Sequence, residues 1–233
     1  GERFACRERK RGALDLLNHL LTDGEQPDAL VYSSCDVRAL QGRYRYVITL
    51  DADTFLPPGA ACRLVGAMAH PLQKGRVGVI QPRMDVAADT VATRIQRWLG
   101  GPGGTDPYGL ARQDVYQDVF GRGSFVGKGI YQPDLWMARL AGRLPAMPLL
   151  SHDLAEGEIA LSALASDIVL YDGHPATLAG WQKRLHRWTR GDWQLLPMLF
   201  DWRLPFLSRH KIWDNLRRSL VPAAQAALLI LGA

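Results

Sequence analysis

Three short apolar runs, separated by segments of helical period, constrain the fold of this chain most strongly. They are rich in β-branched and aromatic residues and cover 44–50, 76–81 and 167–171. Apolar residues at helical spacing and the flanking breakers predict helices over 12–21, 60–69, 93–99 and 154–165. Strands that alternate with helices over short connections are typical of a mostly parallel sheet covered by helices. The sequence therefore predicts an α/β fold.

Composition excludes several other classes of protein. The chain has 233 residues, of which 47% are hydrophobic and 22% charged, so disorder, collagen and coiled coil are excluded. Three cysteines without a CxxC spacing indicate neither a disulfide framework nor a cysteine zinc site. The net charge of +5 suits anionic small molecules or lipid headgroups as well as nucleic acid, so charge does not decide between these partners.

Acidic residues follow the first of these apolar runs and a further apolar pair. Asp51 and Asp53 follow the first run, and Asp153 follows the apolar pair at 149–150. The carboxyl ends of strands carry the chemistry of such sheets. Two carboxylates at i and i+2 can hold Mg²⁺ or Mn²⁺ with diphosphate oxygens completing the shell, although a capped turn before Pro57 explains a lone DxD equally well.

A basic and aromatic segment at 184–188 supplies groups of another kind. It places two guanidiniums and an indole close together, and guanidiniums suit phosphates whereas indoles suit the faces of sugars. The alternative is a basic amphipathic helix whose tryptophans, Trp181, Trp188 and Trp193, are buried in the core.

The glycine-rich segment 120–131 invites a comparison with phosphate-binding P-loops. Only three residues separate Gly123 from Gly127, and Lys128 is followed by Gly129 rather than by Ser or Thr. This spacing does not fit a P-loop. The six histidines are scattered without paired spacing, so a histidine metal site is not expected.

Both ends of the chain indicate a piece of a larger protein. The chain begins at Gly1 without an initiator Met or a signal peptide. Residues 220–233 are apolar but shorter than the ~20 residues of a membrane-spanning helix, which favours the start of a truncated span. The preceding segment 211–218 interleaves Trp and Leu with basic residues, as helices on an anionic membrane surface do. A C-terminal core helix is the alternative.

The sequence resembles the membrane-bound processive glycosyltransferases and, more closely, the glycosyltransferase domain of bacterial cyclic β-1,2-glucan synthases. The strings that carry the resemblance cover nearly the whole chain and lie at 8–18, 46–72, 80–84, 105–109, 114–131, 149–157 and 184–197. The resemblance implies a GT-A-like catalytic domain over 1–205 that is incomplete at its N-terminus. An interfacial helix and the start of a transmembrane helix are expected over 206–233.

The resemblance also implies a reaction. An inverting glucosyltransferase would transfer glucose from UDP-glucose to a growing β-1,2-glucan by one in-line displacement. Asp51 and Asp53 would hold Mg²⁺ or Mn²⁺ on the diphosphate, and Asp153 would accept the proton of the attacking hydroxyl.

The remaining site residues fall into a donor and an acceptor group. Those implied to bind the donor are Lys10, Arg11, Arg184 and Arg187. Those implied to bind the acceptor are Trp188, Ser124, Lys128 and Gly129. Two positions depart from the pattern of the family: Arg184 stands where Gln is expected, and Arg122 where an acidic residue is expected.

The expected partners are UDP-glucose, a β-glucan acceptor, membrane lipids and other domains of a larger polypeptide, but not nucleic acid. The expected location is the bacterial inner membrane, with the catalytic domain on the cytoplasmic face. A related processive transferase with another sugar or linkage is the first alternative. A non-catalytic remnant or binding module is the second.

Overall fold

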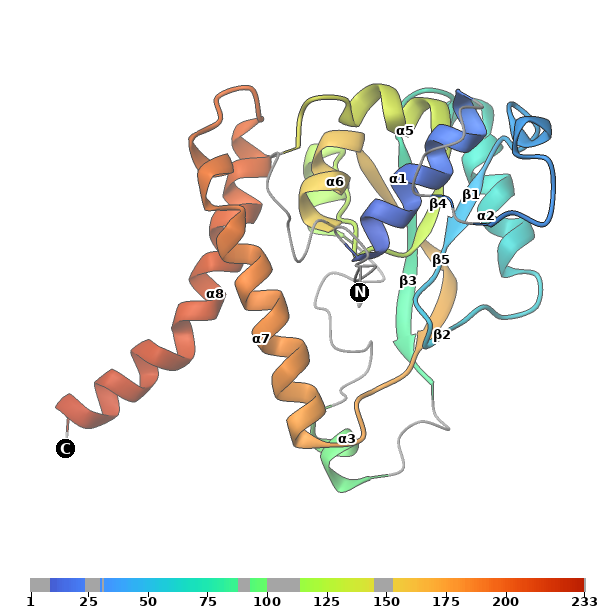
Figure 1. Ribbon diagram of the computed structural model, residues 1–233. Coiled ribbons are helices and arrows are strands. Elements are labelled where there is room, and N and C mark those ends of the chain that lie inside the picture. Colours follow the sequence, from blue (N-terminus) through green and yellow to red (C-terminus); the bar gives the residue numbers. More distant parts are fainter. Residues whose placement is uncertain are drawn as a thin grey trace, which may run out of the picture.

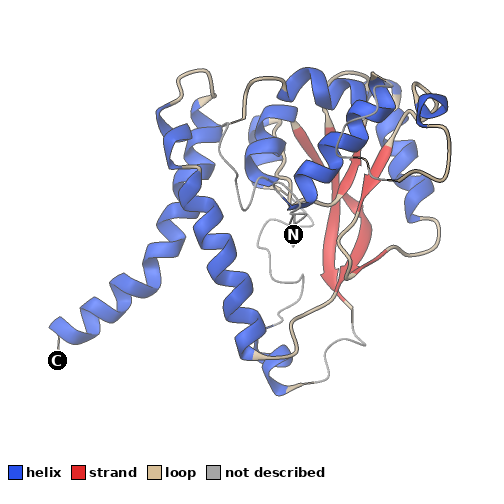
Figure 2. Cartoon of the chain, in the orientation of Figure 1, coloured by secondary structure: helices blue, strands red, loops and turns tan. Residues whose placement is uncertain are grey.

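A computed structural model describes residues 9–23, 30, 32–87, 93–99, 114–144 and 153–232. It contains a five-stranded sheet with helices on both faces and two long helices beside it (Figures 1 and 2). The α/β class and the helical cover predicted above are thus confirmed. The apolar pair 149–150 and the string 105–109 lie outside the described residues.

The described elements have the following bounds. The α-helices are α1 (Arg9–Thr22), α2 (Ala60–Ala69), α3 (Arg94–Leu99), α4 (Val115–Phe120), α5 (Pro133–Leu140), α6 (Asp153–Ala160), α7 (Leu178–Gln194) and α8 (Phe206–Leu231). The strands are β1 (Val47–Thr49), β2 (Thr54–Phe55), β3 (Val79–Val86), β4 (Gly129–Tyr131) and β5 (Ser162–Asp172). Short 3₁₀ helices are η1 (Val37–Leu40), η2 (Pro71–Gln73) and η4 (Leu196–Phe200).

The sheet is mixed rather than mostly parallel. Its order is β1-β4-β3-β5-β2, with β3 parallel to β5 and the other three pairs antiparallel. Because β4 is antiparallel to both β1 and β3, the strands β1, β3 and β5 share one direction. These three are the strands that the sequence predicted. The two strands that it missed, β2 and β4, are short and run the opposite way.

The predicted helix over 154–165 ends five residues early. Leu161 has a φ of 64°, which breaks the helix after Ala160. The next residues, Ser162 to Ala165, pair with Val79 to Pro82 of β3. A parallel strand partner therefore overrides the helical propensity of this stretch.

Two apolar layers cover opposite faces of the sheet. Alternate residues of a strand point to opposite faces, and β3 and β4 follow this rule. Ile80 and Ile130 pack with Leu64 of α2 on one face. Val79 and Tyr131 pack with Trp136 of α5 on the other face, where α1 and α6 also lie (Figure 1).

A third apolar cluster joins α8 and η4 to α6. It combines Leu154, Ala155 and Ile159 of α6 with Leu195, Met198, Leu204, Ile212 and Leu216. The first half of α8 is thus packed, whereas its residues from Leu220 on are exposed. Within the described part of the chain, no helix combines the length and the apolar character needed to cross a membrane.

Candidate active site

The ends of β1 and β5 bring separate acidic residues together. Asp51 and Asp53 follow β1, and Asp172 ends β5. The Thr54 hydroxyl donates to Asp172 Oδ1 at 2.6 Å, and the Gly173 amide donates to the Asp53 carbonyl at 2.9 Å. These contacts bring Asp172 next to the segment that holds Asp51 and Asp53.

Asp51 lies between two lysines. Lys10 Nζ of α1 is 2.7 Å from Asp51 Oδ1, and Lys128 Nζ is 3.1 Å from Asp51 Oδ2. Burial alone would raise the pKa of Asp51, but the ammonium groups of Lys128 and Lys10 lower it below its ordinary value. Asp51 is therefore an anion whose charge is compensated on both oxygens.

Lys128 bridges this carboxylate to a second one. Its side chain is only 12% exposed, and its Nζ is 2.7 Å from Asp172 Oδ2. Burial would lower the pKa of Lys128, but the carboxylates of Asp51 and Asp172 raise it. Sequence reasoning missed Asp172, although it closes an apolar run just as Asp51 does.

Asp53 is joined to the basic and aromatic segment. Arg184 Nη2 of α7 is 3.1 Å from Asp53 Oδ2, and the Arg184 guanidinium lies over the Trp188 ring at 5.9 Å from its centroid. Trp188 meets Trp181 edge to face, with 6.3 Å between centroids. Arg187 is half-buried on the same helix.

The alternative interpretation of 184–188, a helix whose tryptophans are buried in the core, is wrong. Among the described residues of α7, only Gly191 is buried, and Trp193 is 40% exposed. Trp181 and Trp188 are half-buried, and the helix packs against α8 and η4.

Asp153 begins α6 and faces a glycine. Gly127 has a φ of +84°, and a Cβ at this position would come within 2.9 Å of the Asp153 carboxyl group. The Gly127 carbonyl also accepts a hydrogen bond from Lys10 Nζ at 2.8 Å. Gly127 thus lies next to both the Asp153 carboxylate and the Lys10 ammonium that pairs with Asp51. A carboxylate in the first turn of a helix is further stabilised by the helix dipole.

Glu156, one turn further along α6, is a second residue that sequence reasoning missed. It is only 8% exposed, and its Oε1 lies 3.5 Å from Arg11 Nε of α1. Burial, followed by the nearby Asp153 charge, raises the pKa of Glu156 to about 8, although Arg11 and Lys10 oppose this. No spacing in the sequence signals this group, because its burial comes from the packing of distant segments.

Two of the residues expected to contact the acceptor are enclosed. Ser124 is 3% exposed, and its hydroxyl has no hydrogen-bond partner among the described residues. Gly129 begins β4 and lies against the backbone of Ile80, where a Cβ would overlap the Ile80 carbonyl. Close packing of the strands therefore requires glycine at 129. The acceptor roles of both residues stay predictions.

The carboxylate oxygens at this end of the sheet suit a hard cation that the substrate also helps to bind. Both carboxylates are part-exposed and already paired, Asp53 with Arg184 and Asp51 with two ammonium groups. The described residues form no cluster of three or more His, Cys, Asp or Glu side chains suited to a metal. Mg²⁺ is commonly held by one or two carboxylates and by phosphate oxygens. Asp53, with Asp51, fits this arrangement.

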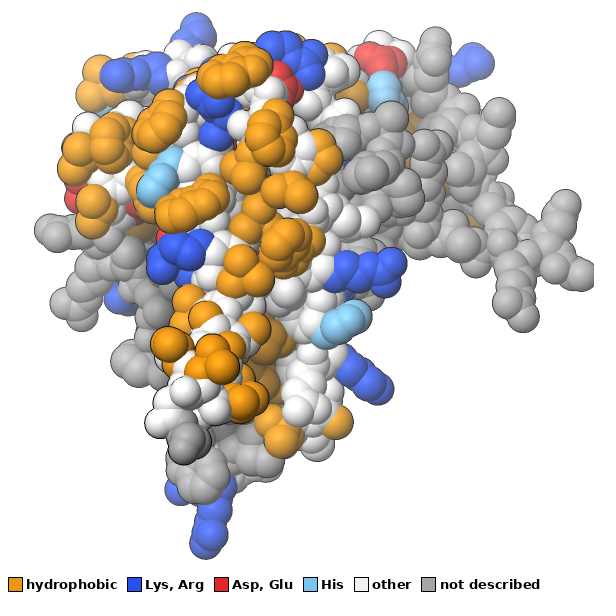
Figure 3. Space-filling model, turned by 90° about the vertical axis from the view of Figure 1, so that its left-hand side faces the viewer, with side chains coloured by type: hydrophobic (Ala, Val, Ile, Leu, Met, Phe, Trp, Pro, Cys, Tyr) orange, Lys and Arg blue, Asp and Glu red, His pale blue; other side chains and the backbone are white. Residues whose placement is uncertain are grey.

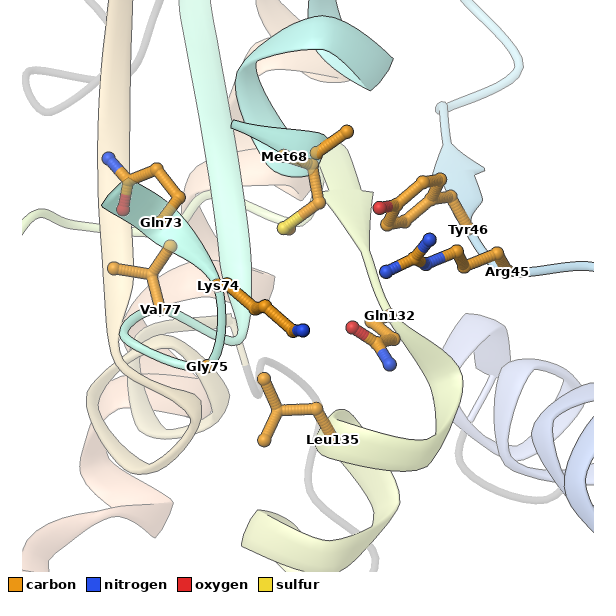
Figure 4. A pocket seen from close by; sticks show the side chains of 10 residues that line it. Arg45, Tyr46, Met68, Gln73, Lys74, Gly75, Val77, Gln132 and Leu135 are labelled. Atoms are coloured by element: carbon orange, nitrogen blue, oxygen red, sulfur yellow. The ribbon is translucent and has the colours of Figure 1, made fainter. Parts of the chain in front are cut away.

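A small cavity lies near the opposite end of the sheet. Arg45, Lys74 and Gln132 extend toward its centre, beside Met68 and Leu135 (Figure 4). It is lined by residues that precede β1 and β3 and follow β4. None of the predicted site residues lines it.

Fold and site together define an α/β protein with a charged cluster where its parallel-running strands end. No family model matches the chain. The chain is 40% identical over 240 residues to the cyclic beta-(1,2)-glucan synthase NdvB of Rhizobium meliloti (strain 1021). The match covers 97% of this chain and 8% of that much longer protein. The chain is therefore related to a segment of a cyclic β-(1,2)-glucan synthase, which confirms the resemblance seen in its sequence.

Proposed function

We propose that the protein is a glycosyltransferase domain that adds glucose from UDP-glucose to a growing β-1,2-glucan with inversion. One observation carries this proposal: Asp51, Asp53 and Asp153 lie with Lys10 and Arg184 at one edge of the sheet. The relative is a glucan synthase, which supports the same reaction class.

Asp153 is the proposed base. In a single displacement, the acceptor oxygen attacks the anomeric carbon as its proton passes to the Asp153 carboxylate. The bond from that carbon to the diphosphate breaks, and an α-linked donor becomes a β-linkage. Such a step needs a base but no enzyme nucleophile.

The donor end of the site would stabilise the departing diphosphate. The cationic side chains proposed for this role are Lys10, Arg11, Arg184 and Arg187. Guanidiniums bind phosphate oxygens in pairs, and preformed positive charge lowers the barrier where negative charge develops. Asp53, with Asp51, would hold Mg²⁺ or Mn²⁺, which supplies further charge stabilisation when bound.

The acceptor end is assigned to Trp188, together with Ser124, Lys128 and Gly129. Trp188 is half-buried, and an indole face suits the C–H face of a sugar ring. Lys128 contacts Asp51 and Asp172, so its ammonium lies beside one of the two carboxylates proposed to hold the metal.

The test is the substitution Asp153→Asn. We expect glucosyl transfer from UDP-glucose to fall by about 10²- to 10⁴-fold, because the base is lost, while UDP binding is retained. Asp118→Asn is the matched control, since Asp118 is an exposed carboxylate in the first turn of α4. Wild-type transfer by the Asp153 variant would contradict the assignment.

The same assay distinguishes the alternatives. A product with another sugar or linkage would favour a related processive transferase. Failure of the folded protein to bind any nucleotide sugar would favour a non-catalytic remnant.

We also propose that the apolar side of α8 and η4 rests on a bacterial inner membrane, with the site on the cytoplasmic side. Exposed large apolar side chains gather there in a band with Arg and Lys beside it (Figure 3): Phe200, Trp202, Phe206, Trp213, Leu220, Leu228, Leu229, Ile230 and Leu231. Arg209 lies over Trp202 at 4.4 Å from the ring centroid, and Arg217 over Trp213 at 5.9 Å. Aromatic and basic side chains in one band suit anionic headgroups above an apolar layer.

A further inference from the structure

Lys128 lies between two carboxylates, of which only Asp51 belongs to the proposed metal site. Its Nζ is 3.1 Å from Asp51 Oδ2 and 2.7 Å from Asp172 Oδ2. The Asp51 side chain is 40% exposed, whereas those of Lys128 and Asp172 are 12% and 20% exposed. A cation from solvent therefore reaches Asp51 first, but an ammonium already contacts its Oδ2.

The two ammonium groups on Asp51 differ in their other contacts. Lys10 Nζ is 2.7 Å from Asp51 Oδ1, and its second acceptor is the neutral carbonyl of Gly127 at 2.8 Å. Lys128 has its longer contact with Asp51 and its shorter contact with Asp172, a second anion. Lys128 can therefore leave Asp51 and keep an ionic partner, whereas Lys10 would keep only a carbonyl.

Asp172 is held in place by groups other than Lys128. Its Oδ1 accepts a hydrogen bond from the Thr54 hydroxyl at 2.6 Å, and the Thr54 oxygen accepts one from the Asp51 amide at 3.2 Å. Thr54 and Asp172 are also partners in the register of β2 and β5. The carboxylate that would retain Lys128 is thus anchored to the same turn as Asp51, and Lys128 needs no new partner when it leaves.

Resting on the function proposed above, we propose that Lys128 and Asp172 are positioning residues that set the affinity of the site for its divalent cation. Lys128 competes with the cation for Asp51, and Asp172 retains the ammonium when Asp51 is occupied. Without the Asp172 charge, Lys128 is held more strongly at Asp51, so the competition increases. Without Lys128, Asp172 has no ammonium to retain. The effect of Asp172 should therefore depend on the presence of Lys128.

The experiment is titration of the protein with Mn²⁺ at pH 7 and one fixed concentration of UDP-glucose. Electron paramagnetic resonance counts the free Mn²⁺. Four proteins are compared: the wild type, Lys128→Met, Asp172→Asn and the double variant. Binding of Mn²⁺ to the nucleotide sugar in solution is the same in every titration and cancels in the ratios of Kd. Circular dichroism checks that each variant is folded.

We expect Lys128→Met to lower the Kd for Mn²⁺ about tenfold, because it removes a positive charge from contact with a carboxylate that holds the cation. Asp172→Asn should raise the Kd about tenfold while Lys128 is present, but less than about threefold in the Lys128→Met background. A charge that acts directly on the cation would give the same factor in both backgrounds, so a difference between the factors measures the effect that passes through Lys128.

The matched controls are Arg63→Met and Asp167→Asn. These residues form an ion pair of 2.6 Å in which both side chains are over half exposed, and neither contacts the site. Both controls should leave the Kd for Mn²⁺ unchanged. If Lys128→Met does not fold, the double variant, which removes both members of the pair, is compared with Asp172→Asn and should bind Mn²⁺ at least tenfold more tightly.

Three outcomes would overturn the inference alone: no tightening in a folded Lys128→Met, the same factor for Asp172→Asn in both backgrounds, or a double variant that binds no more tightly than Asp172→Asn. A purely structural role for Asp172 would give the second of these. Absence of Mn²⁺ binding by all the folded proteins is a different result, which would overturn the proposed metal site and this inference with it.

Discussion

Asp51 and Glu156 show how the surroundings give opposite properties to two carboxyl groups of one site. Asp51 has an ammonium on each oxygen and a lowered pKa. Glu156 is more deeply buried, with one cation at a longer distance and a carboxylate nearby, and its pKa is raised. Environments that push the pKa values of acidic groups apart are typical of sites with acid–base chemistry.

The raised pKa of Glu156 predicts a stability that declines with pH. The unfolded value is near 4.5 and the folded value about 8, so the folded state binds one more proton between them. This contribution is fully present below pH 4.5 and is lost as pH rises to 8, by an amount on the order of 3–5 kcal/mol. Glu156→Gln should remove this dependence of stability on pH, because Gln does not ionise.

The measurement is the free energy of unfolding in urea at pH 5, 6, 7 and 8 for both proteins. The other titrating groups are common to both, so the difference between the proteins isolates Glu156. We expect the advantage of Glu156→Gln to grow with pH over this range. A difference that does not change with pH would contradict the prediction.

At the scale of elements, a buried charge network fixes α8 to the site. Lys211 is fully buried, and its Nζ lies 2.6 Å from Glu158 Oε1 of α6 and 2.8 Å from the Gly123 carbonyl. The Ser208 hydroxyl donates to Glu158 Oε2 at 2.6 Å. Through Glu158, α8 is held to the helix that begins with Asp153.

Lys211→Met should destabilise the protein strongly. It removes the closer cation of the buried Glu158 carboxylate and leaves Arg122 at 3.7 Å, which costs about 3–5 kcal/mol. The double variant with Glu158→Gln should recover much of that loss, because no buried charge is then left unpaired. Urea unfolding of both variants measures this, and a loss below about 1 kcal/mol in the single variant would contradict it.

The accuracy of prediction differed between elements for physical reasons. The helix over 60–69 was predicted with its exact bounds, because its apolar spacing and the preceding Pro-Pro-Gly are local signals. β4 has three residues in a glycine-rich segment and β2 has two, so neither has a period to detect. The end of the helix predicted over 154–165 was wrong because pairing with β3 is a long-range effect.

The residues of the candidate site were likewise predictable only where the sequence carries a local signal. Acidic residues that close apolar runs were detectable, and the structure joins Asp51 to Lys10 and Asp53 to Arg184. Lys10 was suggested by the family resemblance alone, whereas Arg184 belongs to a segment that its basic and aromatic residues already indicated. Glu156 was not detectable, since its property arises from the approach of α1 to α6. The metal, donor and acceptor assignments stay predictions.

At the scale of the molecule, the apolar band of α8 and η4 predicts binding to anionic vesicles. The protein should co-sediment with vesicles containing phosphatidylglycerol more than with neutral ones, and added salt should weaken this binding. Replacing Trp202 and Phe206 by Ser should reduce binding several-fold, because both side chains are over three-quarters exposed.

Tyr44→Ser is the matched control for this prediction, because Tyr44 is a half-exposed aromatic residue next to β1, away from α8 (Figure 1). Equal loss of binding in the control, or no loss in the double variant, would contradict the assignment of the band.

The contacts that build the site also determine when it can form during synthesis. Lys10 bonds to the carbonyl of a residue 117 positions later, and Thr54 to Asp172, 118 positions later. Contacts between such distant residues require large loops to close, which slows folding. A ribosome adds about 5–20 residues per second. For several seconds, therefore, the nascent chain carries Asp51 and Lys10 without the strand that completes their surroundings, and a polypeptide that stops short of Asp172 cannot assemble the site.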